Sequence, residues 1–365
     1  MLKISYNKYL FFLTLLGFQT FISAQEQLNL DYSKIYAHCL DGNVKAALPL
    51  LEVPVSSLTE EDQKFKQVFE DRFKGETDNS DYLRDKKTKI HELQLIFRNY
   101  WRQYLLDPNP KHERNLGMNA IGFLKTHFPE VKDKNITRDS LGFFLSQYIK
   151  SRGFLTTTSV NKTGGLYDLL VWRSQRDTLY AFSLKKEKIK TKVVFMQDFV
   201  TLGWEEYATL GKYHPGGWTS NGIIYCVEDA YDLESENFQI SYLAHEGRHF
   251  LDNAAFPGLD NADLEYRAKL SELSLAKITL YDLVEGFISN ANNQSENPHP
   301  LANYHVVSNL SRSLFGKKFE EDIHGWKKIP QKKLNKAAYK LLKRNSKVLK
   351  EQGVVPESSI RAKSN

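Results

Sequence analysis

The sequence predicts an α+β protein in which a helical N-terminal region is followed by a small, mainly antiparallel sheet and a helical C-terminus. Three observations lead to this fold class. Helical periodicity covers most of the first 150 residues, short segments rich in Val, Leu, Phe and Tyr follow up to residue 227, and long helical patterns then return. Strands that are grouped between blocks of helices, without regular alternation, favour this class.

Length and composition are those of a globular protein with a large core. The 365 residues are 41% hydrophobic, 13% aromatic and 26% charged, which excludes a disordered chain and fits one large or two ordinary domains. The two cysteines, Cys39 and Cys226, lie far apart in the sequence, which leaves their pairing open.

Residues 1–24 are expected to be a signal peptide. An apolar run follows Lys3 and Lys8 and gives way to small residues that end at Ala24. The run is too short for a transmembrane helix. We therefore expect an exported protein, periplasmic or extracellular, without stable membrane insertion after cleavage.

Residues 25–150 are predicted to form a mainly helical region. A helix, a glycine turn and a second helix over residues 31–52 resemble half of a tetratricopeptide-type unit, but no second copy predicts an array. Further helices are expected over residues 59–73, 86–107, 114–128 and 140–151.

Residues 151–350 contain the predicted sheet and the longest C-terminal helices, and residues 351–365 are expected to be a flexible tail. Strands are predicted over residues 166–172, 178–184, 190–199 and 222–227, the first two joined in a hairpin by residues 173–177. Helices are predicted over residues 237–251, 263–288, 301–316 and 331–350.

Positive charge concentrates in the last of these helices. Removal of residues 1–24 lowers the formal net charge from +6 to +4, and most of the remaining excess lies between residues 327 and 344. No aromatic-interleaved binding motif accompanies these cations. We therefore expect an amphipathic helix with a solvated basic face and no nucleic-acid partner.

The pentad His245-Glu246-Gly247-Arg248-His249 carries the strongest chemical signal. Histidines four residues apart project from one face of a helix, one turn apart, which suits two nitrogens binding one Zn²⁺ ion. Glu246 is predicted to be catalytic, as the general base toward water that the metal activates.

The third metal ligand is expected from the helix that follows the pentad. Glu265 is the preferred ligand and Glu272 the alternative; they are seven residues apart and so share one helix face. The carboxylate that does not bind the metal is expected to orient a ligand histidine. Asp252, on the pentad helix, is a lesser candidate.

A His-Glu-x-x-His pentad followed by a glutamate on the next helix resembles the gluzincin type of zinc metallopeptidase. The resemblance implies a zincin-like catalytic domain over residues 151–350, a Zn²⁺ cofactor and a peptide or protein substrate along an edge strand. Residues 222–227 or 216–218 are the candidates for that strand. Arg248 departs from the family pattern, in which this position is usually uncharged.

Such peptidases also supply a His or Tyr that stabilises the oxyanion. His305 and Tyr304 are the predicted catalytic residues for this role, while His214, His299 and His324 remain open.

The sequence therefore predicts an exported zinc metallopeptidase that hydrolyses peptide bonds. Two alternatives remain. One is a non-catalytic helical binding or scaffold protein with an inert pentad helix, and the other is a zinc hydrolase that acts on a non-peptide bond, because activated water attacks other acyl bonds as well.

Overall fold

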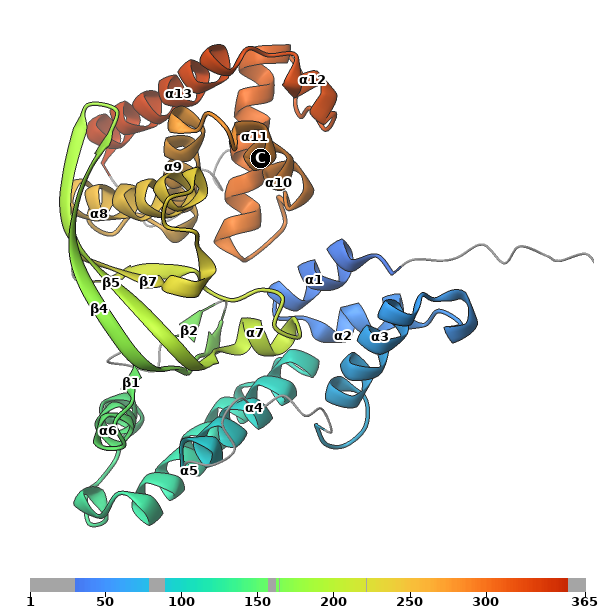
Figure 1. Ribbon diagram of the computed structural model, residues 1–365, viewed down its shortest axis with the longest axis vertical. Helices are drawn as coiled ribbons and strands as arrows, with labels where there is room; N and C mark the ends of the chain where they lie inside the picture. Colours follow the sequence, from blue (N-terminus) through green and yellow to red (C-terminus); the bar gives the residue numbers. More distant parts are fainter. Residues whose placement is uncertain (1–29, 79–88, 157–161, 164, 221, 354–365) are drawn as a thin grey trace, which may run out of the picture.

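The computed structural model describes residues 30–78, 89–156, 162–163, 165–220 and 222–353 (Figure 1). It combines helices with a curled sheet, which confirms the α+β class. The predicted signal peptide and most of the predicted tail lie outside the described residues. Within the described part, no helix is both long and apolar enough to cross a membrane.

The N-terminal region is helical, as predicted. Its α-helices are α1 (Tyr32–Leu40), α2 (Val44–Ala47), α3 (Glu60–Phe73), α4 (Lys89–Leu106), α5 (Pro110–His127) and α6 (Arg138–Ser151). Helix α5 begins at Pro110, four residues before the predicted start. Proline suits the first position of a helix because its missing N–H has no intrahelical partner there, and the Asn109 side chain caps the helix by accepting from Lys111 N.

The main sheet has five strands in the order β1-β4-β5-β7-β6, and every pairing is antiparallel except that of β5 with β7. Its strands are β1 (Leu155–Thr156), β4 (Leu170–Leu184), β5 (Glu187–Leu202), β6 (Gly217–Ser220) and β7 (Ile223–Val227). A separate pair joins β2 (Lys162–Thr163) to β3 (Leu166–Tyr167).

The predicted hairpin at residues 173–177 was wrong. These residues continue strand β4, and Asp177 pairs with Val194 of β5. The polar side chains here mostly face solvent and so do not interrupt the strand. The chain reverses at residues 185–186, where Lys185 has a positive φ of 56°.

The C-terminal part adds helices α7 to α13. The π-helix η5 (Asn237–Ala244) leads into α8 (His245–Ala255), where a single α-helix had been predicted. The other helices are α7 (Trp204–Ala208), α9 (Asn261–Leu275), α10 (Leu280–Ser289), α11 (Pro298–Phe315), α12 (Ile323–Lys327) and α13 (Gln331–Gln352).

The helix predicted over residues 263–288 is two helices, α9 and α10. The turn between them is held by Glu236, whose carboxylate accepts hydrogen bonds from the backbone N–H groups of Lys277, Ile278 and Thr279. This tertiary contact has no signal in the local sequence.

Two large cores support the fold. One joins the N-terminal helices to α7 and to the near ends of β4 and β5, and the other lies among α9, α10, α11, α12 and α13. The long β4–β5 hairpin curls beside α8 and α9, as Figure 1 shows, and α13 packs along α9. The pentad helix α8 therefore lies between the sheet and the C-terminal helices.

Candidate metal centre

Two neighbouring helices bring three potential ligand side chains together. His245 and His249 lie one turn apart on α8, and Glu265 projects from α9. The two Nε2 atoms are 3.0 Å apart. The Glu265 carboxylate lies 3.4 Å from His245 Nε2 and 3.3 Å from His249 Nε2. Each residue thus offers one atom within 4.8 Å of the other two.

The spacing of these atoms suits a tetrahedral zinc ion. Zinc bonds of about 2.0–2.1 Å place tetrahedral ligand atoms roughly 3.3 Å apart. The observed separations of 3.0, 3.3 and 3.4 Å agree with this geometry. Two imidazole nitrogens and one carboxylate form a donor set found in catalytic zinc sites, where a fourth position stays open.

Glu272, the alternative third ligand, lies on the other side of the His245 ring. Its Oε1 is 2.6 Å from His245 Nδ1, whereas Nε2 faces His249. A carboxylate in this position fixes the orientation of the ring and makes Nε2, the opposite nitrogen, a stronger metal ligand. Burial lowers the pKa of His245, but Glu265 and Glu272 outweigh this effect and raise it to about 10. The geometry favours Glu265 as the ligand and Glu272 as the orienting residue.

The Glu246 side chain reaches the edge of the sheet. Its Oε2 accepts a 2.7 Å hydrogen bond from Oγ1 of Thr219 on β6. Strand β6 is one of the two edge strands of the five-stranded sheet, the other being β1, while β7 is enclosed between β5 and β6. Of the two segments expected to bind substrate, residues 216–218 therefore overlap the edge strand and residues 222–227 do not.

Gly247 sets the distance between the pentad helix and the β4–β5 hairpin. A Cβ atom at this position would lie 2.6 Å from Phe182 and 2.8 Å from Ile189. A side chain at this position would require Phe182 or Ile189 to shift, so α8 packs with its backbone close against these two side chains of the hairpin.

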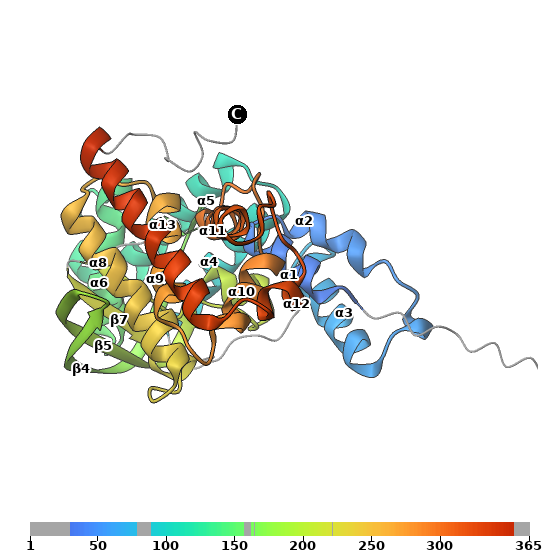
Figure 2. The ribbon, with the colours of Figure 1, turned by 90° about the horizontal axis from the view of Figure 1, so that it is seen from above.

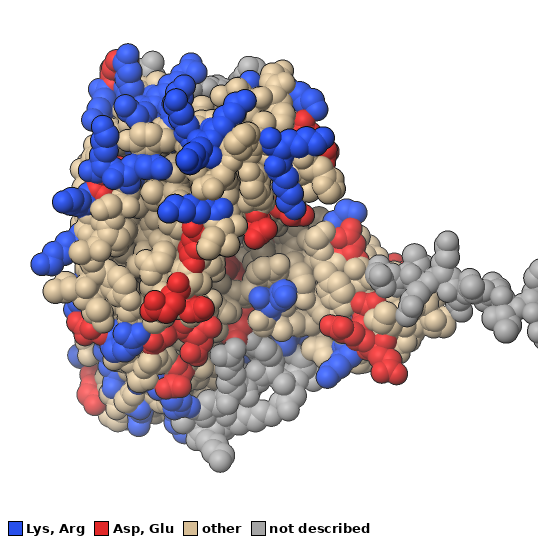
Figure 3. Space-filling model, turned by 45° about the horizontal axis from the view of Figure 1, so that its top comes forward, with Lys and Arg blue, Asp and Glu red and all other residues tan. Residues whose placement is uncertain are grey.

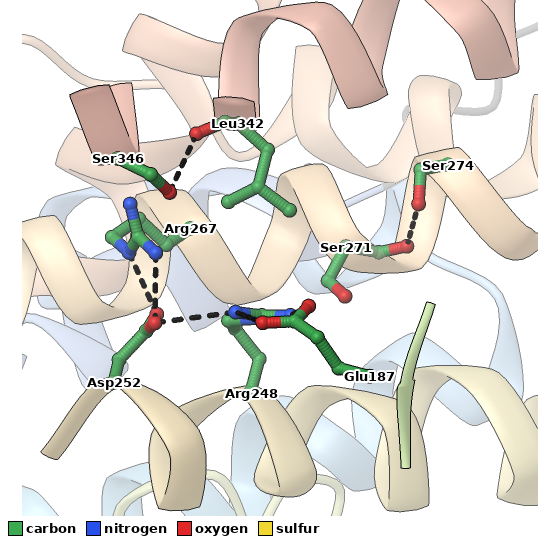
Figure 4. Close-up of polar contacts among 8 residues, drawn as sticks. All are labelled: Glu187, Arg248, Asp252, Arg267, Ser271, Ser274, Leu342 and Ser346. Carbon is green, nitrogen blue, oxygen red and sulfur yellow. Dashed lines mark hydrogen bonds and ion pairs between the residues drawn. The ribbon is translucent and has the colours of Figure 1, made fainter. Parts of the chain in front are cut away.

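Arg248, the departure from the family pattern, belongs to a buried ionic network (Figure 4). Its guanidinium is paired with Glu187 of β5, and its Nη1 is 3.3 Å from Asp252 Oδ1. Asp252 in turn accepts two 2.7 Å hydrogen bonds from Arg267 of α9, which also donates to Asn345 of α13. Arg248 thus links α8 to the hairpin, and Asp252 is a structural residue outside the ligand cluster.

Helix α11 supplies a histidine next to this cluster. It is His299 in the first turn of the helix, and not the predicted Tyr304 or His305 further along. Nδ1 of His299 lies 3.0 Å from Oε2 of Glu265, and the side chain is 58% exposed. Tyr304 stacks on Phe319, and the buried His305 packs edge-on against Tyr304. A role for Tyr304 or His305 in catalysis stays a prediction. Of the three histidines that the sequence left open, the fold brings His299 beside Glu265.

Tyr231 is a neighbour of the site that sequence reasoning missed. Burial raises the pKa of its hydroxyl, and Cys226, Glu246 and Glu272 add to the shift. Gly216 leaves room for this phenol, because a Cβ atom there would lie 2.1 Å from the Tyr231 oxygen. A lone tyrosine before a helix carries no pattern that would have singled it out.

The free energy of unfolding is expected to depend on pH through Glu205 on α7. Burial and the nearby Asp168 raise its pKa from 4.5 to about 7, although His299 acts in the opposite direction. The folded state therefore holds this proton more tightly than the unfolded chain does, and the resulting stability is lost as the pH rises from 4.5 to 7. We expect Glu205→Gln to raise the free energy of unfolding by roughly 1–3 kcal/mol at pH 8 and by much less at pH 5. Urea unfolding at both pH values measures this, and an equal effect at both would contradict it.

Comparison with known protein families, curated proteins and solved structures finds no match for this chain.

Proposed function

We propose that the protein is an exported zinc metallopeptidase of the gluzincin type, with a zincin-like catalytic domain. The observation that carries this proposal is the convergence of His245, His249 and Glu265, with a glutamate adjoining the first histidine in sequence. The orienting contact from Glu272 to His245 adds support, because histidine ligands of zinc usually donate their second nitrogen to a carboxylate or carbonyl.

The side chains around the cluster suit hydrolysis. Zinc would supply a Lewis acid that polarises a carbonyl and makes water nucleophilic at neutral pH. Glu246, oriented by Thr219, takes the proton of the attacking water and passes it to the leaving amine. His299, whose Nδ1 lies 3.0 Å from Glu265 Oε2, joins the predicted candidates Tyr304 and His305 for donating a hydrogen bond to the oxyanion.

The substrate in this proposal is a peptide that lies along β6. An edge strand offers unpaired backbone N–H and C=O groups to an extended peptide. Because Thr219 of β6 contacts Glu246, a peptide bound at this edge would bring its scissile bond close to the general base.

Metal content and peptide hydrolysis in two matched variants test the proposal. We expect wild-type protein to contain one zinc per chain and to cleave an unfolded protein substrate, and a chelator to abolish cleavage. Glu265→Ala should lose zinc binding, whereas Glu272→Ala should retain zinc at about 10–100-fold lower affinity, since it removes only the orienting contact. Wild-type protein without stoichiometric metal would instead favour a non-catalytic scaffold, and zinc retention in Glu265→Ala would reject Glu265 as a ligand.

A further inference from the structure

We propose that helix α13 and the adjoining turn at Ile278 form a docking surface for a bilayer that contains anionic phospholipid. Helix α13 has 22 residues and so is about 33 Å long. It carries eight Lys and Arg residues and one acidic residue, Glu351. The formal charge of the whole chain is +6, so the remainder of the chain carries slightly more acid than base.

The basic residues of α13 are all exposed. The face that packs on the protein consists of Leu334, Ala337, Ala338, Leu342 and Leu349. The exposed cations are Lys332, Lys333, Lys336, Lys340, Lys343, Arg344, Lys347 and Lys350. Among the described residues only Lys347 has an ion-pair partner, Glu351 at 3.6 Å.

This charge forms a contiguous region at one end of the molecule. Lys and Arg side chains gather across the top of Figure 3, whereas Asp and Glu side chains lie mainly across the middle and lower parts of that view. Figure 2 shows α13 as a long helix that crosses the top of the molecule. One straight, outward-facing helix presents its charges to a broad surface and does not enclose a groove.

An apolar side chain projects beside the first turns of α13. Ile278, in the turn between α9 and α10, is 84% exposed. Asn335 of α13 donates hydrogen bonds to the carbonyls of Leu273 and Ala276, which places this turn next to the helix. Three hydrogen bonds from the turn to the Glu236 carboxylate keep the backbone of Ile278 in place.

A lipid surface fits these features better than a nucleic acid does. Nucleic-acid surfaces usually combine cations with aromatic side chains that stack on bases or with a groove that follows the backbone, and α13 offers a convex row of lysines. Basic residues and an exposed aliphatic side chain together suit an anionic bilayer, where the cations are attracted to headgroups and the aliphatic group enters the interface.

Vesicle co-sedimentation of the full chain without residues 1–24 tests this proposal. We expect binding to vesicles of phosphatidylglycerol and phosphatidylcholine but not to phosphatidylcholine alone, and loss of binding in 1 M NaCl, where charges are screened beyond about 3 Å. The triple charge reversal Lys336→Glu, Lys340→Glu and Lys343→Glu should lower the partition coefficient at least about a hundredfold. Ile278→Ser should lower it about fivefold.

A matched control is the reversal of three exposed lysines outside α13: Lys125→Glu on α5, Lys132→Glu in a turn and Lys150→Glu on α6. This variant changes the net charge by the same amount and should still bind. Equal loss in both triple variants would reject a specific surface, and so would equal binding to both kinds of vesicle. Tighter binding of the wild type to duplex DNA than to anionic vesicles would reject the lipid assignment. Unchanged midpoints of urea unfolding in all variants show that they are folded, so the outcome of this test does not depend on the proposed zinc site.

Discussion

Glu246→Gln is expected to retain zinc and to lose peptide hydrolysis by several orders of magnitude. The amide keeps the size of the side chain and can still contact Thr219, but it cannot accept a proton from water. The candidate ligand atoms of His245, His249 and Glu265 are unchanged by this substitution. Metal content by atomic absorption and kcat/KM on a fluorogenic peptide measure the two effects separately.

Glu234→Gln is a suitable control for the loss of a carboxylate, because Glu234 is exposed and lies outside the ligand cluster. It should retain full activity. Full activity in Glu246→Gln would reject Glu246 as the general base, whereas loss of zinc in that variant would show that Glu246 contributes to the metal site itself.

Asp252→Ala is expected to lower the free energy of unfolding by about 3–5 kcal/mol. Asp252 is 1% exposed and lies between the guanidinium groups of Arg248 and Arg267, which are 3% and 1% exposed. Removal of one member of a buried ionic network leaves the remaining charges with too few partners in a poorly solvated place. Equilibrium unfolding in urea measures this loss.

The matched control for this change is Asp133→Ala, an exposed position where the free energy of unfolding should change by less than about 0.5 kcal/mol. Asp252→Asn should lie between the two, since the amide retains a hydrogen-bond acceptor. A loss below 1 kcal/mol in Asp252→Ala would contradict the view that this network holds α8 against α9.

Local patterns predicted the parts of the site that depend on one or two adjacent helices. The spacing of His245 and His249 placed them on one face of α8, and the seven-residue spacing of Glu265 and Glu272 placed both carboxylates toward His245. The same reasoning predicted both ends of α3 and α6 to within two residues, because their caps are encoded locally, and it predicted the C-terminal end of α4 to within one residue.

Local sequence patterns could not predict contacts between segments that are distant in the sequence. His299 reaches Glu265 only because α11 packs across α9, and a histidine near the start of a helix gives no sign of that. The polar middle of β4 resembled a turn in the sequence because its side chains are mostly polar and exposed. It is a strand because its backbone pairs with β5. The role of Arg248 likewise depends on Glu187, Asp252 and Arg267, which the fold brings together from three elements.

The close packing at Gly247 has a consequence for protein engineering. Because a Cβ atom there would meet the Phe182 ring and the Ile189 side chain, a larger residue must displace these two side chains or move α8 away from the hairpin, while His245, His249 and Glu265 keep their identities. The same packing means that trimming Phe182 or Ile189 would create compensating room from the opposite side. The position of α8, which carries His245 and His249, is therefore tied to the size of residue 247 and of the two side chains that face it.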